Sequence, residues 1–127
     1  MDEGDEAGLA LRLERLDGGV DDPLLRAEIA AFDVDALAFA AMSERFIDQL
    51  KAGEAHPAMP SMMKYAGTEL NKRRHELIMA AGGSDALEWE RKEPRDWLRT
   101  KANSIEGGTS EIQLGIVAKH ILGLPNA

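Results

Sequence analysis

The stretch Asn103-Ser-Ile-Glu-Gly-Gly-Thr-Ser-Glu-Ile-Gln113 separates two helical patterns. Gly107 and Gly108 end the first pattern, because glycine weakens a helix and accepts turn conformations. Ser110, with Gln113 three residues later, fits a capping box, so a final helix is expected to run to about Leu122. Glycines also let a backbone approach a ligand closely, and N–H groups at a helix start attract anions such as a nucleotide phosphate. Many helices begin after Gly and Ser with nothing bound, so local physics leaves both interpretations open.

Two longer helices are expected before this stretch. Asp22 followed by Pro23 predicts a helix start. The Asp carboxylate can accept hydrogen bonds from the free N–H groups of the first turn, and Pro at the first helical position lacks an N–H that would have no partner within the helix. Gly53 is expected to end that helix. Ser61 is expected to cap the second helix, which Gly82-Gly83 terminates. The predicted apolar stripe of the first helix consists of Leu25, Ile29, Phe32, Leu37, Met42, Phe46 and Leu50.

Shorter elements complete the expected fold. Residues 84–91 are predicted to form a short helix, and Pro94 to begin another that runs toward Ile105. Residues 1–20 are expected to be a frayed or partly helical segment, since Leu9, Leu13 and Leu16 follow helical spacing. No segment alternates as a strand would. The sequence therefore predicts an all-α fold, an antiparallel four-helix bundle over residues 21–127.

Composition excludes several functional classes. The chain has 127 residues, 44% apolar and 30% charged, and this balance fits one globular domain. It contains no cysteine, so disulfides, thiolate zinc sites and a cysteine nucleophile are excluded. The net charge of −8 argues against nucleic-acid binding. No apolar run reaches membrane-spanning length, and the acidic first residues are unlike a targeting peptide, so no membrane contact and a cytoplasmic location are expected.

Few residues suggest chemistry by themselves. Glu106 borders the Gly-Gly turn, where a carboxylate could act as a general base on a carbon acid, although such a glutamate is more often a solvated loop residue. The three histidines lie far apart without partners at ligand spacing, so no metal site is expected. No serine lies in a nucleophile-elbow motif.

The segment Ile105-Glu-Gly-Gly-Thr-Ser-Glu-Ile-Gln113, with the tail Ile121-Leu-Gly-Leu-Pro125, resembles the C-terminal end of acyl-CoA dehydrogenases. In that family a Gly-Thr-(Ser/Asn)-Glu-Ile loop opens the last helix, and a Leu-Gly-Leu-Pro-like tail follows. A second match runs from Ser61-Met-Met-Lys64 to Gly82-Gly83 and resembles the family's penultimate long helix. The two matches occur in the family's order.

The resemblance implies a parent flavoprotein of fatty acid metabolism, an oxidoreductase that removes hydrogens from the α and β carbons of an acyl-CoA. It implies FAD as cofactor and a homo-oligomer. Gly107, Gly108, Thr109 and Glu111 would lie against FAD, and Gly82-Gly83 would approach the FAD of a neighbouring subunit. Glu106 is the candidate catalytic residue.

The sequence departs from the family pattern in three respects. If the resemblance holds, this chain would lack the N-terminal and β-domains of the family. Where some members read Tyr-Glu-Gly-Thr, Gly107 stands at the position of the catalytic glutamate and Glu106 at that of the tyrosine; other members take the base from an earlier helix. Met79 stands where the family has a glutamine three residues before Gly-Gly.

Two hypotheses follow. In the first, the chain is the C-terminal domain of a flavoenzyme, inactive alone, whose β-domain comes from the rest of the protein or from another subunit. In the second, it is an independent helical module for dimerisation or scaffolding. Self-association is expected under both, because removing a domain leaves an apolar patch.

Overall fold

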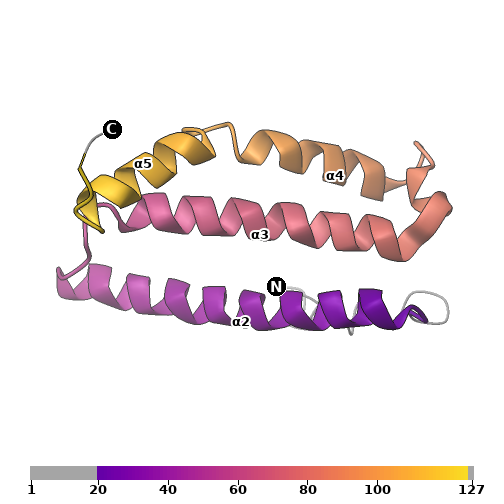
Figure 1. Ribbon diagram of the computed structural model, residues 1–127, viewed down its shortest axis with the longest axis horizontal. Helices are drawn as coiled ribbons and strands as arrows, with labels where there is room; N and C mark the ends of the chain where they lie inside the picture. The colour runs from indigo at the N-terminus through magenta and orange to yellow at the C-terminus, as the bar shows by residue number, and fades with distance from the viewer. Residues whose placement is uncertain (1–19, 126–127) are drawn as a thin grey trace.

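The structure, a computed structural model, describes residues 20–125, and all regular structure within that range is helical. In chain order the elements are α2 (Pro23–Ala52), α3 (Met59–Gly82), the 3₁₀ turn η1 (Gly83–Leu87), α4 (Lys92–Asn103) and α5 (Ser110–His120). Figure 1 shows three rows, with α3 in the middle, α2 on one side, and α4 and α5 end to end on the other. The prediction of an all-α antiparallel fold with four helices is confirmed.

Residues 1–19 and 126–127 lie outside the described range. The predicted frayed or partly helical segment of residues 1–20 therefore falls, except for Val20, on residues about which the structure says nothing. Among the helices between residues 20 and 125, none combines the length and apolar character needed to cross a membrane.

Local signals set both ends of α2. The Oδ1 atom of Asp22 accepts the N–H of Leu24 at 2.9 Å, and Pro23 occupies the first helical position. Gly53 ends the helix with a φ of 73°, a left-handed conformation that glycine adopts at little cost. Both predicted boundaries are confirmed.

The start of α3 differs from the prediction. The helix begins at Met59, and Ser61 lies inside its first turn instead of capping it. The Nδ1 atom of His56 accepts the N–H of Ala58 at 3.1 Å, so a histidine side chain binds a donor at this helix start. The predicted end is correct, because α3 stops at Gly82 and Gly83 has a φ of 56°.

The shorter elements shift by one to a few residues. The short helix expected over residues 84–91 is the 3₁₀ turn η1, and α4 begins at Lys92, so Pro94 lies within its first turn, where the missing N–H removes no helical bond. Helix α4 ends at Asn103, before the expected Ile105, and α5 ends at His120, before the expected Leu122.

A small cluster of buried apolar side chains lies where the first part of α2 meets the last part of α3. It consists of Ile29 and Phe32 on α2 and Leu77 on α3, with Val20 among the half-buried residues packed against it. Ala58 and Ala86 are buried elsewhere. The predicted α2 stripe is only partly correct, because Leu37 is 72% exposed and Leu50 is 55% exposed. Leu37 lies five residues after Phe32, which turns it well away from the side that meets α3.

Helix α3 is the common neighbour of the other elements. It packs against α2, α4, α5 and η1, whereas α2 makes no contact with α4 or α5 among the described residues. The helices therefore form a layer one helix thick over residues 20–125. As a result every residue from Ser61 to His75 on α3 is half-buried, and none is fully enclosed.

Candidate functional site

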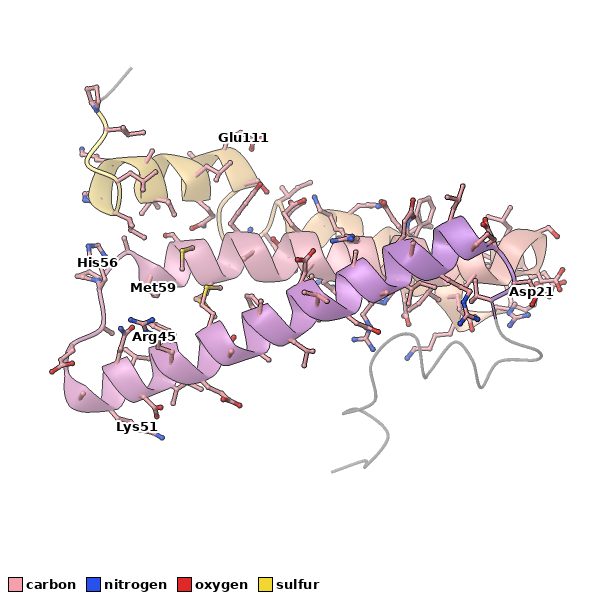
Figure 2. All side chains as sticks on the ribbon, turned by 60° about the horizontal axis from the view of Figure 1, so that its bottom comes forward. Asp21, Arg45, Lys51, His56, Met59 and Glu111 are labelled. Carbon is pink, nitrogen blue, oxygen red and sulfur yellow. The ribbon has the colours of Figure 1, made fainter. Side chains whose placement is uncertain are left out.

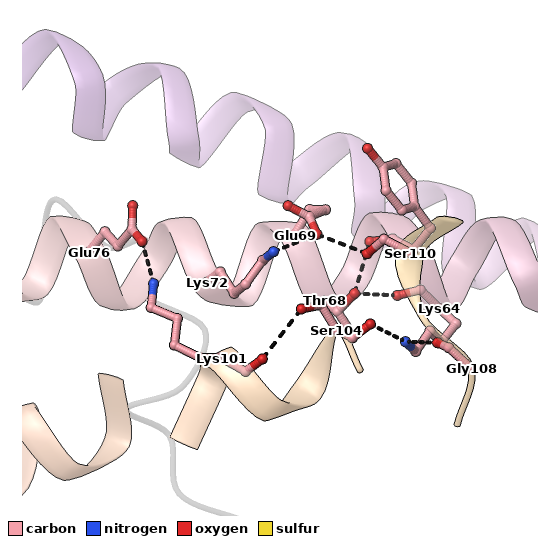
Figure 3. Close-up of polar contacts among 10 residues, drawn as sticks. Lys64, Thr68, Glu69, Lys72, Glu76, Lys101, Ser104, Gly108 and Ser110 are labelled. Carbon is pink, nitrogen blue, oxygen red and sulfur yellow. Dashed lines mark hydrogen bonds and ion pairs between the residues drawn. The ribbon is translucent and has the colours of Figure 1, made fainter. Parts of the chain in front are cut away.

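The candidate site is the loop between α4 and α5, residues 104–109, which lies beside the first half of α3. Lys64 on α3 holds this loop through two hydrogen bonds, shown in Figure 3. Its Nζ donates to the backbone carbonyl of Ser104 at 3.2 Å and to that of Gly108 at 2.6 Å. A charged donor on two carbonyls makes comparatively strong bonds, so one side chain fixes the path of the loop.

The two glycines of the loop are required by its backbone. Gly107 has a φ of 67° and Gly108 a φ of 99°, conformations that other residues rarely adopt. A Cβ on Gly108 would lie 2.6 Å from Nε2 of Gln113. The Gln113 side chain is buried there and donates from Nε2 to the carbonyl of Gly107 at 3.0 Å. Gln113 thus supports the loop from within and does not form the predicted capping box.

The start of α5 has its own acceptors. Thr109, and not the predicted Ser110, is the N-cap, since its Oγ1 accepts the N–H of Ile112 at 3.4 Å. The Glu111 carboxylate has its own backbone N–H and the Thr109 hydroxyl as neighbours, and these two donors lower the Glu111 pKa. Figure 2 shows Glu111 at the head of α5, on the side away from α2. The N–H of Ile112, one of the groups expected to face an anion, therefore already has a protein acceptor.

A cavity of about 390 Å³ adjoins this helix start. Its walls come from α3 and from both sides of the loop: Tyr65, Glu69, Lys72, Ser104, Ile105, Thr109, Ser110, Glu111 and Leu114. Glu69 binds Lys72 at 2.7 Å and accepts the hydroxyl of Ser110 at 3.3 Å. Since Lys72 is already paired, the carboxylates of Glu69 and Glu111 make this cavity a poor place for a phosphate. Its hydroxyl, carboxylate and tyrosine groups suit a neutral ligand rich in hydroxyls.

Glu106 lies on the other side of the loop and does not line this cavity. Both of its carboxylate oxygens accept from Nη2 of Arg99 at 3.1 Å, and Oε1 also accepts from Nδ2 of Asn103 at 2.8 Å. The bonds from Arg99, then that from Asn103, lower the Glu106 pKa. A general base at a carbon acid works best with a raised pKa and little water around it. The contacts of Glu106 therefore weigh against the predicted catalytic role.

Gly82 and Gly83 lie at the far end of α3. Gly82 follows Lys64 by eighteen residues of continuous helix, which corresponds to about 27 Å. A Cβ on Gly82 would lie 2.7 Å from Cβ of Ala86, so the pair allows α3 to turn tightly into η1. Gly82-Gly83 and the loop therefore form two separate surfaces of this chain.

The structure brings four of the predicted site residues together, namely Gly107, Gly108, Thr109 and Glu111, while their contact with a cofactor stays a prediction. Sequence reasoning missed the roles of Lys64 and Arg99. Lys64 lies forty-four residues before Gly108, and no local pattern announces such a pairing. The sequence did single out Gln113, but as the partner of Ser110 in a capping box and not as the side chain that supports the loop. Within residues 20–125, no group of three His, Asp or Glu side chains is placed to hold a metal ion.

Comparison with known proteins identifies the family. The family model described as acyl-CoA dehydrogenase, C-terminal domain, matches residues 9–122. Among curated proteins, the acyl-CoA dehydrogenase IpdE1 of Mycolicibacterium smegmatis is 27% identical over 121 residues, covering 91% of this chain and 29% of the relative. IpdE1 of Mycobacterium tuberculosis is also 27% identical, over 124 residues, covering 91% of this chain and 30% of the relative. The acyl-CoA dehydrogenase FadE34 of Mycobacterium tuberculosis is 33% identical over 86 residues, 67% of this chain and 12% of the relative.

No solved structure gives a significant match. The chain spans less than a third of the length of the IpdE1 proteins that it matches. Because the family model covers nearly all of the chain, and the curated relatives agree with it, the chain belongs to the acyl-CoA dehydrogenase family and corresponds to its C-terminal helical domain.

Proposed function

We propose that this chain is the helical part of an FAD-dependent acyl-CoA dehydrogenase and contributes one wall of its flavin site. The observation that carries the proposal is the loop of residues 107–109, whose conformation needs both glycines and is fixed by Lys64 and Gln113. A loop fixed from behind, with Thr109 and Glu111 beside an adjacent cavity, suits a binding surface that is formed before the ligand arrives.

The residues of the cavity fit part of FAD. The two carboxylates beside Thr109 disfavour the diphosphate, so we assign this wall to the hydroxyl-bearing or ring portion of the cofactor. FAD would supply the acceptor for hydride in the dehydrogenation of an acyl-CoA. This chain would hold the cofactor in position and exclude water from it. The catalytic base would then lie outside the described loop, because the contacts of Glu106 hold it as an ion pair.

The remaining parts of the site would come from a β-domain, either elsewhere in a longer protein or on another subunit. Alone, the chain is expected to bind no stoichiometric FAD and to show no acyl-CoA dehydrogenase turnover. We propose the cytoplasm and fatty acid metabolism as its setting.

The decisive experiment uses a purified assembly of this chain with the polypeptide that supplies the β-domain. In that assembly, flavin absorbance per protomer is compared between the natural chain, Thr109→Val, Glu111→Gln and the control Lys51→Met. The control is at an exposed residue near the end of α2, with 74% of its side chain accessible. The two loop variants are expected to lose flavin on dilution while the control retains it. Equal retention in all four proteins would reject a flavin contact at this loop.

The alternative function is a stand-alone dimerisation or scaffolding module. The observation that favours it is the exposure of large apolar side chains along α2, among them Val34 at 66% and Leu37 at 72%. Light scattering separates the possibilities when combined with the flavin measurement. A stable homo-oligomer that never assembles with a flavin-binding partner would support the module, whereas a clean monomer would contradict the self-association expected under both hypotheses.

A further inference from the structure

The outer side of α2 carries an apolar stripe. Helix α2 meets the rest of the described chain only through α3 and forms one edge of the layer (Figure 1). Val34 lies two residues after the buried Phe32, and two residues turn a helix by about 200°, so Val34 points away from α3. The apolar residues on this outer side follow one another at intervals of three and four and are all exposed: Ala27, Ala30, Val34, Leu37 and Ala41.

The pattern of this stripe fits a second helix lying along α2. Apolar residues that alternate at intervals of three and four form the contact line of two helices packed along their length. Val34 and Leu37, at the centre of the stripe, are large and mostly exposed, and the alanines toward both ends let another helix approach closely. A contiguous apolar patch on the surface of a soluble protein commonly marks an interaction site. The outer side of α2 therefore has the character of a contact surface.

We propose that the stripe binds α2 of a second copy of this chain, antiparallel, with a twofold axis midway between residues 35 and 36. In this register Val34 contacts Leu37 of the partner subunit, and Ala30 contacts Ala41 of the partner subunit. The twofold axis repeats both contacts, as in most dimers of identical chains. The two largest apolar side chains of the stripe thus meet at the centre of the interface, with small side chains on either side.

The charged residues beside the stripe fit the same register. Arg26, Glu44 and Asp48 lie along one edge of it, because eighteen residues make about five complete turns of a helix and four more add only about 40°. In the antiparallel pair Arg26 comes within one turn of Glu44 and Asp48 of the partner subunit, at both ends of the interface. Within the described residues Glu44 has no ion-pair partner, and Arg26 bonds only the carbonyl of Val20, at 3.4 Å. Both side chains can therefore pair across the interface.

These charges also select the direction and the identity of the partner. In a parallel pair, Arg26 would face Arg26 of the partner subunit and Glu44 would face Glu44 of the partner subunit, so like charges would repel. In the antiparallel pair, Arg26 and Glu44 match because they lie at nearly equal distances on either side of the midpoint. A pattern that complements itself in this way favours a second copy over an unrelated protein. The proposal does not depend on whether the chain contacts FAD.

Sedimentation equilibrium of the full chain tests the proposal. The natural chain is compared with Leu37→Asp and with the control Leu87→Asp, whose leucine in η1 is 68% exposed, close to the 72% of Leu37. The natural chain and the control should form dimers. Leu37→Asp should raise the dimer dissociation constant about a hundredfold, because each of the two copies loses a buried leucine that contributes about tenfold. A natural chain that is monomeric up to about 1 mM, or equal dissociation constants for the two variants, would overturn the proposal.

Disulfide trapping tests the direction of the two helices, since the natural chain contains no cysteine. The variants Ala30→Cys and Ala41→Cys are oxidised separately and as a mixture. A disulfide requires the two Cα atoms to approach within about 7 Å. In the antiparallel pair residue 30 of one copy faces residue 41 of the other, whereas the two copies of residue 41 lie about 16 Å apart along the helices. The mixture should therefore form cross-linked dimers about tenfold faster than either variant alone. Equal or faster cross-linking of a single variant would show a different pairing and overturn the proposal.

Discussion

Replacing Lys64 with methionine is the most informative single change for the loop. Methionine keeps most of the apolar stem but removes the ammonium that bonds Ser104 and Gly108. A hydrogen bond to a charged group contributes about 1.5–3 kcal/mol when well formed. Because Lys64 is half-buried and the carbonyls can regain water, we expect the free energy of unfolding to fall by about 2 kcal/mol in total for both bonds.

Urea unfolding followed by far-ultraviolet circular dichroism measures this loss. For a domain of this size, about 2 kcal/mol corresponds to a midpoint lowered by roughly 1–2 M urea at an unchanged slope. The control is Lys51→Met, which breaks an exposed pair with Asp48 at 3.9 Å and should cost less than about 0.5 kcal/mol. If the two variants lose the same stability, Lys64 does not clamp the loop and our account of its rigidity is wrong.

Three further predictions concern single residues. Gly108→Ala should lower the free energy of unfolding by about 2 kcal/mol, because alanine would strain the backbone and displace Gln113. Gly115→Ala, with open space around its Cβ, should raise the free energy of unfolding by about 0.5–1 kcal/mol. The urea midpoints of the two variants measure both effects. Asp22→Ala should cost about 1 kcal/mol in the same assay, since it removes the α2 cap. The Glu106 pKa is lowered in the folded chain, so its stabilisation is present above pH 4.5, the ordinary value, and is lost as pH falls through the folded pKa. Acid unfolding of Glu106→Gln should therefore show a weaker pH dependence than the natural chain, and an identical dependence would contradict this.

Sequence signals predicted the fold where the causes were local. Asp22, Pro23 and Gly53 act within one turn of themselves, so both ends of α2 were predictable. Gly82-Gly83 likewise predicted the end of α3, because glycine accepts the conformations that end a helix. By contrast, Ser61 and Ser110 were interpreted as caps from residue type alone. Thr109 caps α5 in place of Ser110, because Gly108 at a positive φ sets which side chain faces the first turn. At the start of α3 no side chain caps the helix, and His56 accepts only the N–H of Ala58.

The candidate site was predictable only in part, for a similar reason. The glycines of the loop carry a sequence signal because they act on their own backbone. The partners that hold the loop come from other elements, as with Lys64, and the partner that draws Glu106 away from the cavity is Arg99 on α4. Nothing in the spacing of these residues indicates that they meet. Sequence reasoning therefore located the loop but not the direction in which its side chains face.

The central place of α3 has a consequence for how the molecule comes apart. Since α2 meets the rest of the described chain only through α3, it can detach as a unit while α3, α4 and the loop between α4 and α5 keep their mutual contacts. Partial opening of this kind costs less free energy than global unfolding. A disturbance that begins at α2, such as the arrival or loss of a neighbouring helix, would thus be relayed to the loop by a single element, with Lys64 as the point of transmission.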